Sequence, residues 1–233
     1  MNMTGLLRFP AARAPLPSEG ALSAPGQHSV ERRHALRLLA RGAGLAGALS
    51  VLGLSACTES KPSFNAIDLT GAEYARDFRM KDMRGQERSL ADFKGKVVAV
   101  FFGFAQCPDV CPTTMLEMKQ IKDKLGADGD KLQVIYITVD PERDTPDVMK
   151  AYMEAFDPSF LALIPTAEQL AATAKDFKIY YKKVEGKTPT SYTMDHSAAS
   201  YLYDPQGRLR LYARYGTPVD ALASDIQALL KQG

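Results

Sequence analysis

The sequence predicts an α/β fold with a mixed central sheet, helices on both faces and a hairpin extension at the N-terminal end. Two nearly unbroken apolar runs, 96–104 and 132–139, are rich in β-branched and aromatic residues, which is typical of central strands covered on both faces. Segments that read as helices follow each run, and Asp204-Pro205-Gln206-Gly207 forms a clear hairpin turn near the C-terminus. Strands that alternate with helices favour a layered α/β structure.

Local signals support each element in chain order. Residues 78–80 and the turn at Arg84-Gly85 indicate the N-terminal hairpin. Pro112 suits the first turn of a helix because its missing N–H is not needed there, and Asp140-Pro141 ends the second apolar run. We expect a helical turn at 89–93, strands at 96–104, 132–139 and 160–164, helices starting near 112 and spanning 145–156 and 166–177, a hairpin of 200–203 with 209–215, and a last helix at about 218–230.

The order strand, helix, strand, helix, then hairpin and helix is the thioredoxin order, so we predict a thioredoxin-like fold. The sequence has no internal repeats, and its folded part is the size of one compact core, which argues against a second domain. With 45% hydrophobic and 24% charged residues, the composition excludes both a polytopic membrane protein and a wholly disordered chain.

The first 56 residues read differently from the rest. Four arginines between 32 and 41 precede an uncharged block, 42–56, which is shorter than the roughly 20 apolar residues that span a bilayer. This length suits the apolar segment of a cleavable export signal, and the alternative is a short anchor that is never cleaved. In both cases the folded domain is expected outside the cytoplasm.

The end of this block, Leu-Ser-Ala-Cys at 54–57, resembles a bacterial lipobox. The resemblance implies that Cys57 is acylated and becomes the mature N-terminus. The arginine-containing stretch also resembles a twin-arginine signal, with Ala35 at a position where a bulky apolar residue is expected. We therefore expect a signal peptide at 1–56, a linker at 57–63 and a domain at 64–233, held at the extracytoplasmic face of a bacterial membrane, in the periplasm, by the lipid on Cys57.

The charge of the domain argues against a nucleic-acid partner. Six of the 29 basic residues and two of the 27 acidic residues lie in the first 56, so the remainder carries 23 basic and 25 acidic residues. The basic excess of the whole chain belongs to the leader, and the domain has no compositional support for binding nucleic acid.

Two cysteines and one histidine are the chemically distinctive residues of the domain. Cys107 and Cys111 follow the first central strand, at the carboxyl end where open α/β sheets place their sites. Cys111 falls near a helix N-terminus, whose dipole favours a thiolate, the species that attacks disulfides or binds metals. The spacing alone leaves three possibilities open: a disulfide or redox dithiol, a metal site, and inert thiols.

His196 favours the metal site. It precedes the predicted strand 200–203, which should run antiparallel to the two central strands, so His196 is expected at the same sheet edge as the cysteines. Structural zinc nearly always takes four ligands and an iron–sulfur cluster needs about four cysteines. Two thiolates and one imidazole instead suit copper, with a net charge of −1 for Cu(I) or 0 for Cu(II).

Three motifs follow one another in the chain: Phe101-Phe102-Gly103-Phe104 with Cys107-Pro108-Asp109-Val110-Cys111-Pro112-Thr113-Thr114, then Val139-Asp140-Pro141-Glu142-Arg143-Asp144-Thr145-Pro146, then Asp195-His196-Ser197. In this combination they resemble the Sco/SenC copper proteins, over about 64–230. The resemblance implies that Cys107, Cys111 and His196 bind copper and that the protein helps to assemble the copper centre of cytochrome c oxidase. It implies four partners: the copper-bearing oxidase subunit, a thioredoxin-like reductant, a copper donor and the membrane. Asp140 is expected in the outer sphere of the site, and Gln106 stands where many relatives carry a histidine.

The expectation is therefore a metallochaperone, in which Cys107 and Cys111 are the redox-active pair if the protein also has thiol–disulfide reductase activity. The main alternative is an extracytoplasmic thiol–disulfide oxidoreductase that keeps oxidase cysteines reduced, or a thiol peroxidase on the same fold. Against it, three residues separate the cysteines instead of two, and no proline lies between 190 and 203, where thioredoxin relatives carry one. A copper sensor or store is a third hypothesis. Copper binding should also require reduction, because a Cys107–Cys111 disulfide offers no thiolates.

Overall fold

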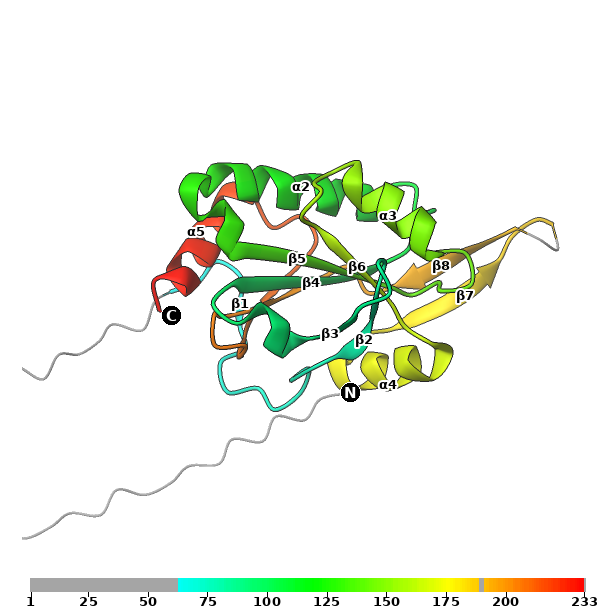
Figure 1. Ribbon diagram of the computed structural model, residues 1–233, viewed down its shortest axis with the longest axis horizontal. Helices are drawn as coiled ribbons and strands as arrows, with labels where there is room; N and C mark the ends of the chain where they lie inside the picture. Colours follow the sequence, from blue (N-terminus) through cyan, green and yellow to red (C-terminus); the bar gives the residue numbers. More distant parts are fainter. Residues whose placement is uncertain (1–62, 189–190, 233) are drawn as a thin grey trace, which may run out of the picture. The chain divides into compact units, whose positions relative to one another are not determined.

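An eight-stranded mixed sheet forms the centre of the computed structural model, which describes residues 63–188 and 191–232 (Figure 1). The strand order is β1-β10-β9-β4-β5-β6-β2-β3. The central strands β4, β5 and β6 are parallel, and β9 pairs antiparallel with β4. The strands of this sheet are β1 (Ile67–Asp68), β2 (Arg79–Asp82), β3 (Glu87–Ser89), β4 (Val97–Gly103), β5 (Leu132–Thr138), β6 (Leu161–Ile164), β9 (Ser200–Tyr203) and β10 (Leu209–Ala213).

Helices cover both faces of the sheet, as predicted. In Figure 1, α2, α3 and α5 lie on one face and α4 on the other. Within the described residues, no helix has the length and apolarity needed to cross a membrane. The helices are α2 (Val110–Lys124), α3 (Pro146–Glu154), α4 (Ala167–Phe177) and α5 (Val219–Leu230), with 3-10 turns η1 (Leu90–Phe93) and η2 (Gly126–Lys131).

The core is centred on the two strands that the apolar runs predict. Every residue of β4 and of β5 is buried, and the two strands are parallel over their whole length. This confirms the thioredoxin-like arrangement. The predicted N-terminal hairpin is also present as β2 and β3, and β2 extends the main sheet by pairing with β6.

The structure adds a second, two-stranded sheet that the sequence does not predict. Strands β7 (Tyr181–Glu185) and β8 (Tyr192–His196) form an antiparallel hairpin that projects past the end of the main sheet in Figure 1. Four of the five residues of β7 are exposed, so β7 has no apolar period to mark it as a strand. His196, expected in a loop, is the last residue of β8.

The expected leader 1–56, the lipidation site Cys57 and most of the linker 57–63 lie outside the described residues.

Other differences from the predicted elements concern the ends of helices. Helix α2 begins at Val110, two residues before Pro112, and α3 begins after Thr145, whose hydroxyl accepts a hydrogen bond from the Val148 N–H.

Candidate metal centre

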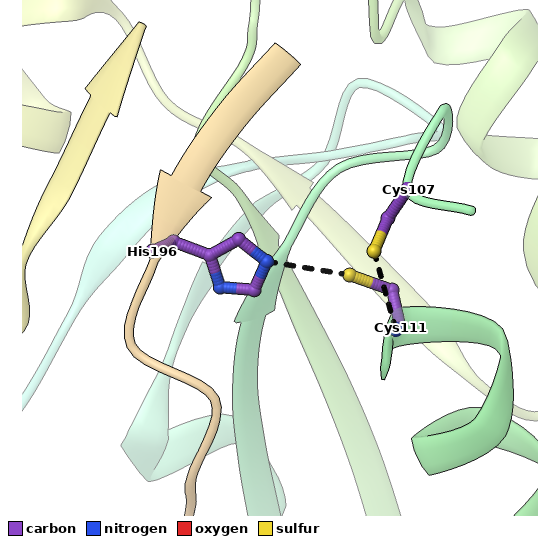
Figure 2. A group of neighbouring side chains, drawn as sticks. All are labelled: Cys107, Cys111 and His196. Atoms are coloured by element: carbon purple, nitrogen blue, oxygen red, sulfur yellow. Dashed lines mark hydrogen bonds between the residues drawn. The ribbon is translucent and has the colours of Figure 1, made fainter. Parts of the chain in front are cut away.

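The cysteine pair joins the end of β4 to the start of α2. The Cys107 N–H donates to the Phe104 carbonyl at 3.1 Å, which turns the chain back after the strand. Cys111 lies in the first turn of α2, and its N–H donates to Cys107 Sγ at 3.4 Å (Figure 2). The Asp109 side chain, at the N-cap position, makes no capping bond. The sulfur of Cys107 therefore faces the positive end of the helix dipole.

The two thiols differ in exposure. Cys107 is half-buried, whereas Cys111 is fully buried. Burial raises the pKa of the Cys111 thiol well above its usual value. The expectation that the helix would lower the pKa of Cys111 is therefore wrong for the metal-free protein, because loss of water outweighs the dipole.

His196 presents one ring nitrogen to the thiols. Its Nε2 lies 3.5 Å from Cys111 Sγ (Figure 2), and its Nδ1 lies 2.9 Å from the Ser197 carbonyl oxygen. A carbonyl only accepts hydrogen bonds, so Nδ1 carries the proton and the lone pair of Nε2 points at the sulfur. Burial also lowers the pKa of His196, which favours the neutral ring that metals bind.

The three side chains form a compact set of ligand atoms. The two Sγ atoms and a ring nitrogen of His196 all lie within 4.8 Å of one another, and this is the one such group of three among the described residues. Two metal–ligand bonds placed end to end measure about 4.5 Å, so small side-chain movements suffice to bring all three onto one ion. The donor set is soft, and it fits copper by its chemistry.

Gly103 keeps space open beneath the Cys111 sulfur. A Cβ atom at this position would lie 2.8 Å from Cys111 Sγ and 2.4 Å from the Tyr136 hydroxyl oxygen. Both distances are shorter than real Cβ contacts, and both neighbours are buried. The last residue of β4 must therefore be glycine for the sulfur to occupy its place.

Asp140 is not part of the ligand group. Its buried carboxylate pairs with the Arg143 guanidinium, and it accepts a hydrogen bond from the Tyr192 hydroxyl at 2.9 Å. Tyr192 begins β8, the strand that ends in His196. The carboxylate thus contacts the hairpin that carries His196, and its outer-sphere role at the metal stays a prediction.

Arg143 connects three parts of the site, a role that its place in the sequence does not indicate. Its guanidinium stacks on the Tyr192 ring, 3.5 Å from the centroid, and Nη1 donates to the Tyr192 carbonyl at 2.9 Å. Nη1 also donates to Gln106 Oε1, in the cysteine loop, at 3.0 Å. We call Asp140, Arg143 and Tyr192 the clasp. It holds the β7–β8 hairpin to the loops that follow β4 and β5.

A second buried carboxylate, that of Asp144, also holds the cysteine loop in place. It accepts hydrogen bonds from the Ala105 N–H, at 3.1 and 3.2 Å, and from the Thr138 hydroxyl at 2.5 Å. Burial raises the pKa of this carboxyl. The end of β5 and the start of the cysteine loop are thereby held together by one buried side chain.

Fold and site together define a thioredoxin-like protein with a dithiol–imidazole ligand set. The SCO1/SenC family model matches residues 68–231, and the chain belongs to this family. An SCO2-like protein of Rickettsia felis is 34% identical over 165 residues, which cover 70% of this chain and 80% of that protein. The mitochondrial SCO2 homologue of Mus musculus is 40% identical over 133 residues, and the match spans about half of that relative, 52% of its length and 56% of this chain.

Two solved structures share the fold and are more than one third identical to this chain over the matched residues. Bradyrhizobium japonicum ScoI, solved with copper bound, is 37% identical with a TM-score of 0.61, and the match covers 66% of this chain and 97% of that one. Apo Sco1 of Thermus thermophilus is also 37% identical, with a TM-score of 0.65 and coverages of 73% and 99%.

Proposed function

We propose that this chain binds one copper ion through Cys107, Cys111 and His196 and delivers it during assembly of the copper centre of cytochrome c oxidase. The observation that carries the proposal is the approach of His196 Nε2 to the buried Cys111 sulfur, from an element far away in sequence. Copper is bound in the ScoI structure from B. japonicum. BsSco, which shares the fold, is a member of the Sco family of cytochrome c oxidase assembly proteins.

The chemistry of the site supports cargo binding. Cys107 is the more accessible sulfur, at the helix N-terminus, where a negative charge is stabilised. Cys111 and His196 lie deeper, so they bind only an ion that has already lost most of its water. The site accepts copper in either Cu(I) or Cu(II) form, since thiolates and imidazole are ligands for both.

The setting of the proposed function is the extracytoplasmic side of a bacterial membrane. We propose that residues 1–56 are a removable leader, that the lipid on Cys57 is the anchor, and that 57–63 link the anchor to the domain. The partners are then the copper-bearing oxidase subunit, a copper donor and a thioredoxin-like reductant. The reductant is needed because an oxidising compartment converts Cys107 and Cys111 to a disulfide.

Copper titration of the reduced protein tests the proposal. We expect one copper per chain, and we expect Cys107→Ser, Cys111→Ser and His196→Ala each to weaken binding at least tenfold. The oxidised protein should bind copper far more weakly than the reduced one. Transfer to a purified apo copper domain of the oxidase subunit should follow, and a chain that binds copper without transferring it would be a sensor or a store.

One observation favours a second candidate, a thiol–disulfide reductase acting on oxidase cysteines. Both cysteines are free thiols, one accessible and one buried beside it, which is how an attacking and a resolving thiol are arranged. An insulin-reduction assay separates the candidates. Strong reductase activity that survives His196→Ala would favour the reductase, because a dithiol mechanism does not need the imidazole as a ligand.

A further inference from the structure

Tyr136 carries a buried hydroxyl that makes no hydrogen bond of standard geometry among the described residues, although the Cys111 thiol lies close enough to interact with it. The residue lies in the middle of β5 and is fully buried. Buried tyrosine hydroxyls are normally paired, because burial removes the water that would otherwise bind them. An unpaired one beside a reactive group therefore calls for a physical reason.

The hydroxyl lies next to the Cys111 sulfur. A Cβ atom built on Gly103 would touch both, at 2.4 Å from the hydroxyl oxygen and 2.8 Å from Sγ. The two atoms thus flank the same small space above the end of β4. The Tyr136 ring is fixed there by contacts with the rings of Phe101 and Tyr152, at centroid distances of 5.7 and 5.8 Å.

We propose that the Tyr136 hydroxyl donates a hydrogen bond to the Cys111 sulfur in the reduced protein, and most strongly when copper holds that sulfur as a thiolate. A thiolate is a far better acceptor than a neutral thiol or a disulfide sulfur, so the bond is strongest in the metal-bound state, weaker in the reduced metal-free protein and weakest in the oxidised one. Hydrogen bonds to a cysteine sulfur tune the potential of the metal it binds. Tyr136 is then a positioning and tuning residue, and its metal-bound role rests on the proposed function.

The chain offers a matched control for this hydroxyl. Tyr152 also carries a buried hydroxyl without a partner among the described residues, and its ring packs on that of Tyr136. Its hydroxyl is not among the three atoms nearest to a Cβ at Gly103, and it interacts with the two cysteines electrostatically without a hydrogen bond. Tyr136→Phe and Tyr152→Phe therefore remove the same oxygen atom from one aromatic cluster, and only the first change removes the proposed donor.

The first measurement is the sulfur-to-Cu(II) charge-transfer band of the copper-loaded variants. Loss of the hydrogen bond raises the energy of the sulfur lone pair, so the band of Tyr136→Phe should move to longer wavelength. The second measurement needs no metal: the equilibrium of the Cys107–Cys111 pair with glutathione. Tyr136→Phe should shift this equilibrium roughly two- to threefold toward the disulfide, since the bond lost from the metal-free dithiol is one to a neutral thiol, which is a weak acceptor.

Tyr152→Phe should leave both readings at the wild-type value. Unchanged readings in Tyr136→Phe, or equal shifts in both variants, would overturn the inference, because a general packing effect does not separate the two hydroxyls. If wild-type protein bound no copper at Cys107, Cys111 and His196, the proposed function would fail, and the glutathione equilibrium alone would decide the role of Tyr136.

Discussion

The two halves of the metal centre are built differently. Cys111 lies at the junction of a fully buried strand and a helix, in the core of the domain. His196 lies at the end of a two-stranded hairpin whose other strand, β7, is largely exposed. The sulfur half is therefore fixed by core packing. The imidazole packs edge-on against Phe101 and Phe104, but the hairpin that carries it is held by a few polar contacts. The comparison implies that changes in the first half affect folding and binding together, and changes in the second affect binding first.

Gly103→Ala should have the largest effect, because it acts on the core half. The new methyl group would overlap the Cys111 sulfur and the Tyr136 hydroxyl, and overpacking of this kind costs about 1–3 kcal/mol of unfolding free energy. The displaced sulfur should also weaken copper binding, by about ten- to a hundredfold. Urea unfolding and copper titration measure the two effects.

Gly126→Ala is the control for this change. Its Cβ would meet nothing within 4 Å, but its φ of +55° imposes backbone strain of about 1–2 kcal/mol on alanine. It should lower stability to a similar degree and leave copper affinity unchanged. Equal losses of affinity in both variants would mean that the site responds to general destabilisation and not to the space above Gly103.

Arg143→Lys should have an intermediate effect confined to the hairpin half. Lysine keeps the positive charge beside Asp140 but cannot stack on Tyr192 or bond to Gln106 and the Tyr192 carbonyl at once. We expect roughly tenfold weaker copper binding. Amide exchange should accelerate in β7 and β8 and stay unchanged in β4 and β5. Faster exchange throughout the central strands would show that the clasp stabilises the whole domain and not the hairpin alone.

The same division explains what the sequence could predict. The central strands are long apolar runs, so 96–104 and 132–139 identify β4 and β5 to within one residue at each end. The two cysteines and His196 are the only residues of their kinds in the predicted domain, and the structure brings them together. A long apolar run indicates burial, and a residue type that is rare in a domain can be counted, so both features can be found in a sequence.

The hairpin that carries His196 could not be predicted, because its other residues are neither buried in an apolar run nor unique in type. Strand β7 is polar and exposed, and it exists because its ladder pairs with β8, from Tyr181 opposite His196 to Glu185 opposite Tyr192. Arg143 and Tyr192 carry no local signal, since an arginine in a polar loop and a half-buried tyrosine are common. Their roles arise from contacts across 49 residues of sequence. The role of Tyr136 could not be predicted either, because the residue lies in an apolar run whose pattern one hydroxyl does not change.

Lys183→Ala should have the smallest effect, and it tests whether exposed contacts of the hairpin help to position His196. Lys183 forms an exposed ion pair with Glu142 at 3.2 Å, and its ammonium lies 3.9 Å from the centroid of the Tyr192 ring. Exposed pairs of both kinds contribute about 0.2–1 kcal/mol, and salt screens them. The clasp, with Asp140 buried at its centre, should hold the hairpin without this pair. We therefore expect less than a threefold loss of copper affinity, and the difference from wild type should vanish at 1 M salt. A loss as large as that of Arg143→Lys would mean that surface charges, and not the clasp, determine where His196 lies.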